Sequence, residues 1–388
     1  MFFVPKSRSV LFLNPDYHCS FFLKDELHRR GWRADVLVQP WYPRQLLFRD
    51  DVIQEKLRYG IHLGWSNWLR FVTAMTLRTI RIVRYKYVIH YGSLSQEISE
   101  SERRGRIFLI LLKTWFRLVR ITGTRFVYIP SGCRDHVSKK EWMKIDGGRV
   151  CSNCGYEPQC SDNVNRVNFQ LVRRFSSASL AGDGQRTDEF EETRIRYKSF
   201  DLSLYTPNLP VPPEFVWSTD STIKVLHSHA LTGRESGGKN IKGTGYVIRA
   251  VERLKSEGID VSLVNLSGVA SRNMRFHQVQ ADIIVDQLIY GGYGSTTLEA
   301  MALGKPVICY IRPSWKTYLT SLFPEWASCP IISATPETVY SELRKLVVDA
   351  QYRRKVGEES RRFAEKFLDV RKNVVEFEDM LLSLDDSR

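Results

Sequence analysis

The segment 282–310 places the strongest constraint on how this chain of 388 residues can fold. It reads as a buried strand over 282–286, a glycine-rich turn, a helix over 296–303 that Gly304 ends, and a second strand over 307–310. Strands joined by a helical crossover pair in parallel within one sheet. The segment therefore predicts a parallel sheet covered by helices.

The same alternation of strands and helices occurs in both halves of the chain. Near the start, strands over 10–14 and 34–38 flank a helix over 19–30. In the second half, a strand over 223–227 precedes a helix over 244–256. Thr335 and Pro336 read as the start of a helix that runs to about residue 350, and another helix is expected over 351–367. Hydrophobic residues make up 43% of the chain, which is enough for two sizeable cores.

Four prolines between Pro207 and Pro213 read as a linker between two domains. We expect an α/β fold with two Rossmann-like domains that face a cleft. The first domain is expected over 1–213 and the second over 214–388. A last helix within the acidic C-terminal segment is a candidate to cross back to the first domain.

The turn before the helix at 296 has the composition of an anion-binding loop. Gly292 and Gly294 allow close approach of a ligand to the backbone, and the N–H groups of Ser295 and Thr296 open the helix. Free N–H groups and the helix dipole favour an anion such as a diphosphate. Glu299, one turn later, can accept hydrogen bonds from two ribose hydroxyls. The plain alternative is a tight turn followed by an ordinary helix.

The whole string over 291–308 is more specific than a glycine-rich turn. It resembles the donor-site motif of family-four glycosyltransferases of the GT-B type, which include enzymes of bacterial surface-polysaccharide synthesis. The resemblance implies that Glu299 holds the ribose of a nucleotide-sugar and that the first domain binds the acceptor. The family motif has another Glu eight residues earlier, near the sugar, where this chain has Gly291.

A second element agrees with this resemblance. Arg234 and the Lys242-Gly243 pair, which precede a helix, look like the family's Arg and Lys-Gly residues, whose cations neutralise the donor diphosphate. The leaving nucleoside diphosphate gains negative charge in the transition state, so fixed cations lower the barrier and no catalytic metal is expected. Lys239 is an alternative to Lys242. Both cations could instead be solvated loop residues.

Four of the seven cysteines lie in a polar segment over 131–165, which reads as an inserted loop of the first domain. The four are Cys133, Cys151, Cys154 and Cys160. Four thiolates would satisfy a structural Zn²⁺ ion that pins this loop, with His136 as a substitute ligand. The alternatives are reduced, unliganded cysteines or an iron–sulfur cluster.

Two histidines are candidates for a catalytic base or for ligand binding. His90 lies near the end of a predicted strand over 87–91, and His18 lies in the first turn between a strand and a helix, so both should lie at the ligand-binding edge of the first sheet. The alternative is that each is a packed or exposed structural histidine. Asp16 and Asp135 are equally open candidates.

The net charge is +14, and 12 basic against 3 acidic side chains fall between residues 60 and 125. Predicted helices over 66–84 and 103–121 carry many of these cations on one face. They favour an anionic membrane surface beside a lipid-linked acceptor; the alternative is sheet-covering helices with solvated faces. The absence of a signal peptide and of long apolar runs predicts a cytoplasmic protein, peripheral on the inner face of the plasma membrane.

Together these features predict an enzyme that transfers a sugar from a nucleotide-sugar donor to a hydroxyl acceptor on a glycan or lipid carrier. The first alternative is a nucleotide-sugar epimerase of the same fold. The second is a non-enzymatic, zinc-containing nucleic-acid-binding protein, which is disfavoured because the chain has no obvious aromatic-basic recognition motif. The third is a catalytically silent scaffold, which Gly291 would suit.

Overall fold

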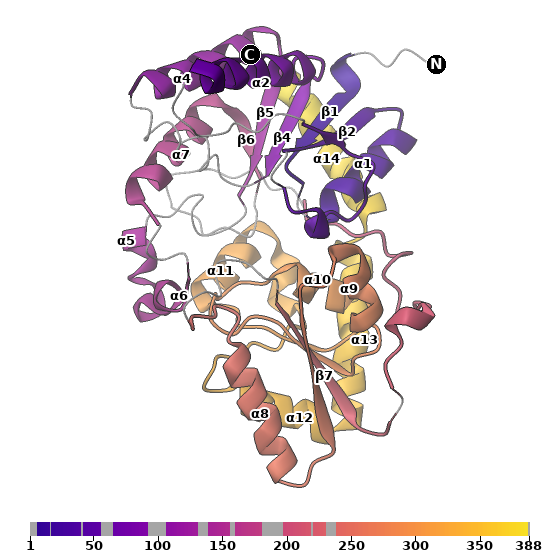
Figure 1. Cartoon of the computed structure of the whole chain (residues 1–388). Coiled ribbons are helices and arrows are strands. Elements are labelled where there is room, and N and C mark those ends of the chain that lie inside the picture. The colour runs from indigo at the N-terminus through magenta and orange to yellow at the C-terminus, as the bar shows by residue number, and fades with distance from the viewer. Residues whose placement is uncertain are drawn as a thin grey trace. The chain divides into compact units, whose positions relative to one another are not determined.

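A computed structural model describes most of the chain. The described residues are 6–15, 17–39, 42–55, 65–91, 106–130, 139–155, 160–180, 197–218, 220–229 and 238–386. The chain divides into two compact units (Figure 1). Unit 1 comprises Met1–Lys139, Ser161–Ser199 and Val370–Arg388, and unit 2 comprises Lys140–Cys160 and Phe200–Asp369.

Unit 1 contains a six-stranded parallel sheet with the order β3-β2-β1-β4-β5-β6. The strands are β1 (Ser9–Leu13), β2 (Arg33–Val38), β3 (Ile53–Gln54), β4 (Tyr87–Tyr91), β5 (Arg125–Ile129) and β6 (Ser176–Ser179). The helices are α1 (Cys19–Arg29), α2 (Trp65–Ile82), α4 (Arg106–Ile121), α7 (Asp162–Phe175) and α14 (Val370–Asp386). The strand–helix–strand opening predicted from the first forty residues is confirmed.

Side chains from both faces of β1 are buried, as expected for a central strand of a parallel sheet. Leu11 and Leu13 pack in the cluster that Phe116 of α4 and Phe175 of α7 also join. Phe12 points to the opposite face, where its ring stacks 6.2 Å from that of Phe377 in α14. Because side chains alternate along a strand, helices are needed on both faces of this sheet.

Unit 2 contains a four-stranded parallel sheet with the order β10-β9-β7-β8. The strands are β7 (Ile223–His229), β8 (Val261–Ser267), β9 (Ile283–Val285) and β10 (Val307–Ile308). The helices are α5 (Lys139–Trp142), α6 (Arg149–Ser152), α8 (Thr244–Ser256), α9 (Ser271–Gln278), α10 (Ser295–Ala302), α11 (Pro313–Leu322), α12 (Val339–Val348) and α13 (Ala350–Phe367). Short 3-10 helices lie in unit 1 at Lys6–Arg8 and Arg44–Leu46. In unit 2 they lie at Ile145–Gly148, Pro213–Phe215 and Pro324–Ser328.

One core cluster joins the sheet of unit 2 to its helices. Val225 and Val285 pack with Val251 of α8 and Leu343 of α12. At another contact, α13 runs so close to the chain after α10 that a Cβ atom on Gly357 would lie 2.6 Å from the backbone oxygen of Gly304. Only glycine permits this approach, which holds α13 against the end of α10.

These units differ from the predicted domains 1–213 and 214–388 at three places. Residues 140–160, from the segment expected to be a loop of the first domain, belong to unit 2. The chain enters unit 2 at Phe200, before the proline-rich stretch, and α14, the last helix that was a candidate to cross back to the first domain, belongs to unit 1. The reason for the first difference is packing: Trp142 stacks on Tyr290 of unit 2, with ring centroids 5.5 Å apart.

Two segments expected to be irregular contain regular structure. Ser176–Ser179 begin a stretch whose serine and glycine content is typical of an exposed loop, yet these four residues form β6, which pairs with β5 at the sheet edge. Within 131–165, α5, α6 and the start of α7 are helical. The expected helix start at Thr335 and Pro336 is wrong, because these residues form a turn and α12 begins at Val339.

Candidate functional site

The carboxyl ends of β7, β9 and β10 lie along one edge of the sheet in unit 2. This is the edge at which open parallel sheets bind ligands. Asp286 follows β9 directly, and its backbone N–H donates to the oxygen of Ile308 in β10 at 2.8 Å. The glycine-rich loop follows Asp286, and α10 begins at Ser295 as predicted to within one residue.

Asp286 joins the glycine-rich loop to Lys242. Its carboxylate is fully buried, and Oδ1 forms an ion pair with the Lys242 ammonium. Oδ2 accepts hydrogen bonds from the Thr297 hydroxyl at 2.7 Å and from the Gly294 backbone N–H at 3.3 Å. Burial alone would raise the pKa of Asp286, but the Lys242 charge and the hydrogen bonds from Lys242 and Thr297 hold it below its ordinary value.

Sequence reasoning predicted Lys242 but missed Asp286. The available signal was an acidic residue directly after a buried strand and before the glycines. A carboxylate there is charged and inaccessible, so it requires a cation partner from elsewhere in the fold. The pair places Lys242 beside the start of α10.

The loop that carries Lys242 is attached to the sheet through His227 and Asn240. The imidazole of His227 is fully buried in β7; its Nδ1 donates to the oxygen of Val285 at 2.8 Å, and Nε2 lies 2.9 Å from the Thr244 hydroxyl. Burial lowers the pKa of His227 to about 4, and the Lys242 charge adds to this effect, so the ring is neutral. Asn240 donates to the same Thr244 hydroxyl at 2.8 Å.

Asn240 also shapes the turn itself. Its side-chain oxygen accepts from the backbone N–H groups of Lys242 at 2.9 Å and Gly243 at 3.1 Å. Gly243 has φ +79°, in the region that glycine tolerates best. Neither His227 nor Asn240 was singled out from the sequence, because their role depends on contacts across the sheet.

Glu299 lies one turn into α10 and is only 5% exposed. Its Oε2 accepts a hydrogen bond from Nε2 of Gln278 in α9 at 2.7 Å. Burial raises the pKa of Glu299 to about 7; the Gln278 hydrogen bond opposes this rise and the Asp286 charge adds to it. The carboxyl group therefore changes its protonation near neutral pH.

The described structure brings together Lys242, Gly292, Gly294, Ser295, Thr296 and Glu299 of the predicted donor site at this edge. Ser295 and Thr296 are half-buried at the start of α10, whereas Gly292 is buried. Arg234 lies outside the described residues. Lys239, the alternative to Lys242, is half-buried on the same loop.

The two predicted catalytic histidines lie in unit 1. His18 precedes α1 and is buried beside the rings of Phe22 and Phe48, at centroid distances of 5.5 and 6.1 Å. His90 lies in β4, one residue before its end, is 6% exposed, and stacks 6.3 Å from the ring of Tyr128. Both lie at the carboxyl ends of strands of the six-stranded sheet, and their catalytic roles stay predictions.

The predicted zinc site has no support from the described part of the chain. Cys133, His136 and Asp135 lie outside the described residues, as does Asp16. Among the residues with described positions, no three His, Cys, Asp or Glu side chains gather as metal ligands would. Cys154 is buried and free, and its backbone N–H bonds the oxygen of Cys151 at 3.1 Å.

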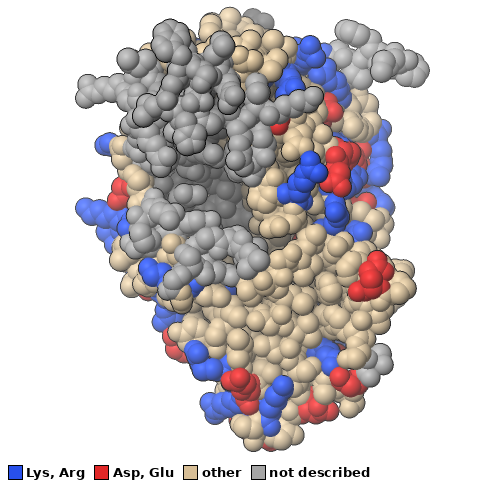
Figure 2. Space-filling view, in the orientation of Figure 1, with Lys and Arg blue, Asp and Glu red and all other residues tan. Residues whose placement is uncertain are grey.

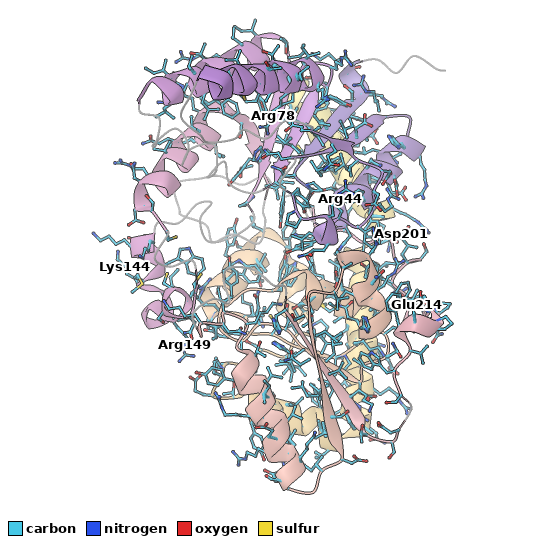
Figure 3. All side chains as sticks on the ribbon, viewed as in Figure 1. Arg44, Arg78, Lys144, Arg149, Asp201 and Glu214 are labelled. Atoms are coloured by element: carbon cyan, nitrogen blue, oxygen red, sulfur yellow. The ribbon has the colours of Figure 1, made fainter. Side chains whose placement is uncertain are left out.

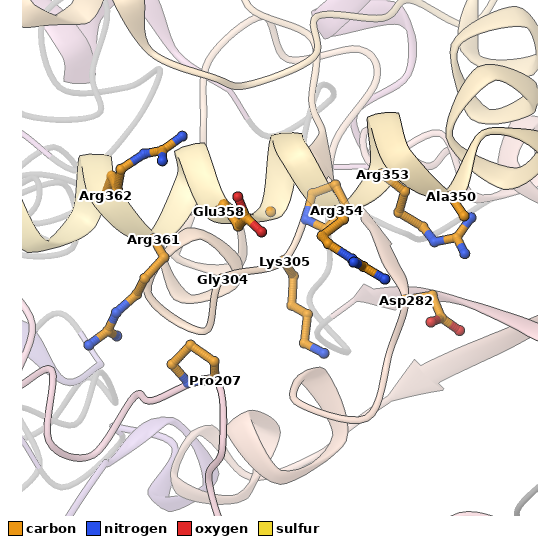
Figure 4. A pocket seen from close by; sticks show the side chains of 12 residues that line it. Pro207, Asp282, Gly304, Lys305, Ala350, Arg353, Arg354, Glu358, Arg361 and Arg362 are labelled. Atoms are coloured by element: carbon orange, nitrogen blue, oxygen red, sulfur yellow. The ribbon is translucent and has the colours of Figure 1, made fainter.

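A separate cavity of about 560 Å³ lies near the opposite end of β9 and β10 (Figure 4). Its side chains come mainly from α13 and from the loop that carries Lys305. Arg361 donates to the backbone oxygens of Tyr205 and Ala302, so this cation joins segments of the unit. Asp282, which precedes β9, also lines the cavity, so the cavity lies at the amino ends of the strands. Open parallel sheets bind their ligands at the carboxyl ends instead.

The basic helices of unit 1 expose cations together with apolar side chains. Arg117 and Arg120 of α4 are exposed, as expected for a basic face, and Leu118 of the same helix is also 57% exposed. Arg78 of α2, which is labelled in Figure 3, is buried instead, 3.9 Å from the carboxylate of Glu55. The exposed large apolar residues of these two helices are Val72, Leu77, Ile80, Ile110, Leu111, Leu118 and Ile121.

No protein-family model matches the sequence, and no curated protein does either. Solved structures are similar to this chain over almost its whole length. HepE from Anabaena in complex with UDP and glucose has a TM-score of 0.57 at 15% identity and covers 97% of this chain and 100% of its own. Sucrose-phosphate synthase from Thermosynechococcus elongatus has a TM-score of 0.57 at 14% identity, with 98% and 100% covered.

A glycosyltransferase from Rickettsia africae has a TM-score of 0.55 at 10% identity and covers 98% of this chain and 99% of its own. At such low identity the likeness describes the fold. It agrees with two parallel sheets, each covered by helices, in one chain. The α/β fold with two Rossmann-like domains is confirmed, and the chain has the GT-B fold.

Proposed function

We propose that this chain is a glycosyltransferase that binds a nucleotide-sugar at the carboxyl edge of the sheet in unit 2. The observation that carries the proposal is the position of Glu299, one turn behind the glycine-rich start of α10 and beside the Lys242–Asp286 pair. An anion-binding helix start followed by a buried carboxylate suits a diphosphate and its adjoining ribose. HepE, a structural neighbour, was solved with UDP and glucose and with UDP-glucose.

On this proposal the donor diphosphate binds the first N–H groups of α10. Gly294 precedes the helix in an extended conformation, and Ser295 and Thr296 are partly exposed there. Lys242 has three N–H donors, so it can keep its ion pair with Asp286 and donate to a phosphate oxygen as well. Arg234, from the same sequence element, is proposed as a second cation.

The ribose hydroxyls donate to the Glu299 carboxylate. The ionised carboxylate accepts both hydroxyls better than the protonated form, which has less acceptor capacity and carries no charge. Gln278 already donates to Oε2, which orients the group. Donor binding should therefore favour the ionised form and release a proton near neutral pH, where Glu299 titrates.

The proposed reaction joins the oxygen of an acceptor hydroxyl to the anomeric carbon of the donor. The bond from that carbon to the diphosphate oxygen breaks, and a base takes the hydroxyl proton. The electron pair of the broken bond remains on the nucleoside diphosphate, whose added charge the Lys242 cation and the α10 N–H groups stabilise. His90 and His18 remain the candidates for the base.

The test is thermal stabilisation by a panel of UDP-, GDP-, ADP- and dTDP-sugars. A ligand that binds only the folded state raises the melting temperature, by an amount that grows with the ratio of ligand concentration to the dissociation constant. We expect stabilisation by one nucleotide class and its loss in Glu299→Ala. Glu252→Ala is the matched control, because Glu252 is exposed on α8. If Glu299→Ala responds like wild type, the donor site is wrongly placed.

Incubating the donor without acceptor separates transfer from epimerisation. An epimerase of this fold would release an epimer or its nucleotide product under those conditions. A glycosyltransferase should leave the donor largely intact until a hydroxyl acceptor is added. Product analysis by chromatography therefore distinguishes the two activities.

We also propose that α2 and α4 lie on an anionic membrane surface next to a lipid-linked acceptor. Exposed apolar residues support this: Ile121 is 80% exposed and Ile110 59%, on the same helix as the exposed Arg117 and Arg120. The two helices contact each other, since Trp115 donates to the Thr79 hydroxyl at 2.6 Å (Figure 1). Apolar side chains flanked by cations suit the lipid headgroup boundary.

Two further observations bear on the membrane proposal, one on all described helices and one on the region of α8 for comparison. Among the described helices, none combines the length and apolar character needed to cross a bilayer. At the lower end of the face in Figure 2, in the region of α8, Lys and Arg side chains alternate with Asp and Glu side chains. Such a mixed surface gives an anionic bilayer less attraction than a face with apolar and basic residues only.

Vesicle flotation tests the membrane proposal. Wild type should float with vesicles rich in phosphatidylglycerol and less with neutral phosphatidylcholine vesicles. The double variant Leu118→Ser/Ile121→Ser should lose most binding to both, because it removes apolar area from the headgroup boundary. Val348→Ser, which changes an exposed valine of α12, is the control. If the double variant and the control float equally, α4 does not contact the membrane.

A further inference from the structure

Arg312 is a buried cation next to the glycine-rich loop. It follows β10 at the carboxyl edge of the sheet, directly before α11, and is only 3% exposed. Its backbone N–H donates to the oxygen of Gly291 at 3.0 Å. Arg312 therefore lies beside the loop that continues into Gly294 and α10.

The guanidinium of Arg312 has no hydrogen-bond acceptor within the described part of the structure. Its three nitrogens, Nε, Nη1 and Nη2, are all buried and unsatisfied. Asp146 is near enough to favour the charged form, but its carboxylate accepts from the Tyr310 hydroxyl at 3.0 Å and forms no ion pair with Arg312. Burying a guanidinium this way is unfavourable unless an anion joins it.

The loop is shaped around this side chain. Gly291 has φ +82°, and a Cβ atom there would lie 3.0 Å from Cβ and 3.3 Å from Nη1 of Arg312. It would also lie 3.3 Å from the ring of Tyr310. Residue 291 can therefore carry no side chain without moving Arg312. The Arg312 side chain occupies the space that a side chain at position 291 would need.

The surroundings of Arg312 are aromatic. Its guanidinium carbon lies 5.3 Å from the centre of the Trp142 ring, and that ring stacks on Tyr290 with centroids 5.5 Å apart. Tyr290 directly precedes Gly291. Aromatic rings exclude water, and an ion pair is stronger where water is excluded.

We propose that Arg312 binds a carboxylate on the donor sugar, so that the donor is a nucleoside-diphosphate uronic acid rather than a neutral hexose. This inference rests on the proposed function, because the diphosphate at the start of α10 would place its sugar near the same loop. A planar guanidinium can donate two parallel hydrogen bonds to a carboxylate, which a neutral hydroxymethyl group cannot accept in the same way.

The test compares matched pairs of donors by calorimetry: UDP-glucuronate with UDP-glucose, and GDP-mannuronate with GDP-mannose, each beside the free nucleoside diphosphate. We expect wild type to prefer the acidic member of one pair by roughly ten- to hundred-fold. Arg312→Gln should lose that preference and keep its affinity for the free nucleoside diphosphate. Arg344→Gln, at a half-exposed arginine of α12, should behave as wild type.

Arg312→Lys is the second variant. It keeps the charge but loses the two-pronged geometry, so it should retain only part of the preference. Unliganded Arg312→Gln should melt at a higher temperature than wild type, since it removes a buried charge that no described residue pairs. This stability readout does not depend on any donor.

The outcomes separate the two proposals. If wild type binds a nucleoside diphosphate but does not distinguish acidic from neutral sugars, the role of Arg312 is overturned and the donor site stands. If none of these nucleotides binds, the proposed function itself fails. A lower melting temperature of Arg312→Gln with an unchanged acid preference would assign Arg312 to packing instead.

Discussion

Gln278 donates a hydrogen bond from Nε2 to Oε2 of Glu299 at 2.7 Å, and both side chains are buried. The two residues come from α9 and α10, the helices that precede and follow β9 in the sequence. This contact holds the carboxyl group at the proposed ribose position. Burial raises the pKa of Glu299 to about 7 although this hydrogen bond opposes the rise, and the site is therefore sensitive to pH.

The first prediction concerns Glu299 and stability. Its pKa is higher in the folded protein than the ordinary value of 4.5, so the folded state binds more protons here between pH 4.5 and 7. This contribution is complete below pH 4.5 and is lost as pH rises through 7, and it amounts to about 3 kcal/mol of the free energy of unfolding. Urea unfolding of Glu299→Gln between pH 5 and 8 should lack this dependence; parallel curves for variant and wild type would contradict it.

The second prediction concerns His227, whose dependence has the opposite sign. Its pKa is depressed from 6.5 to about 4, so the unfolded state binds the proton first as pH falls. The contribution is present above pH 6.5 and is lost on acidification towards pH 4, again by about 3 kcal/mol. His227→Asn should therefore lose less stability than wild type from pH 7 to 5.

The two groups oppose each other between about pH 4.5 and 6.5. Each single variant should expose the slope of the remaining group. Glu299→Gln should become less stable on acidification relative to wild type, and His227→Asn more stable. Slopes of the same sign in the two variants would show that at least one group is not buried as described.

The third prediction concerns the Asp286–Lys242 ion pair. Asp286→Asn leaves the Lys242 ammonium without its anion, and that side chain is only 19% exposed. Breaking such a pair should lower the free energy of unfolding by roughly 3 kcal/mol. Denaturant titration measures the loss, and the exposed Asp220→Asn, which breaks a surface pair with Lys224, should leave stability nearly unchanged.

The fourth prediction separates backbone strain from crowding at Gly291. Gly258→Ala introduces a side chain at φ +78° with no described neighbour within 4 Å, so it should cost about 1 kcal/mol for the left-handed conformation alone. Gly291→Ala has φ +82° and also crowds Arg312, so it should cost roughly 1–2 kcal/mol more. Equal losses in the two variants would mean that Arg312 moves aside freely.

Much of the secondary structure in unit 2 could be predicted from the sequence. The helix expected over 296–303 is α10 at Ser295–Ala302, and the helix expected over 351–367 is α13 at Ala350–Phe367. These elements depend on local hydrophobic period and on glycines at their ends, which a sequence displays directly. The helix start expected at Thr335 failed because its capping pattern also suits a turn.

The contacts that give the site its electrostatics were less predictable. Asp286 lies 44 residues from Lys242 in the sequence, and the two meet because β9 pairs with β7 in a parallel register. The pKa of Glu299 depends on the depth at which α10 is buried and on Gln278, 21 residues away. Neither the Asp286–Lys242 contact nor the burial of Glu299 against Gln278 can be predicted from local propensity.

The sequence by itself determined that a strand, a glycine-rich turn and a helix come in that order at the start of α10, because φ preferences and hydrophobic spacing act between near neighbours. Only the tertiary structure decided that residues 140–160 pack in unit 2, that α14 belongs to unit 1, and that Arg312 lies beside Gly291. These placements depend on burial and charge contacts between distant segments, whose free energy arises only when the sheets and helices are assembled.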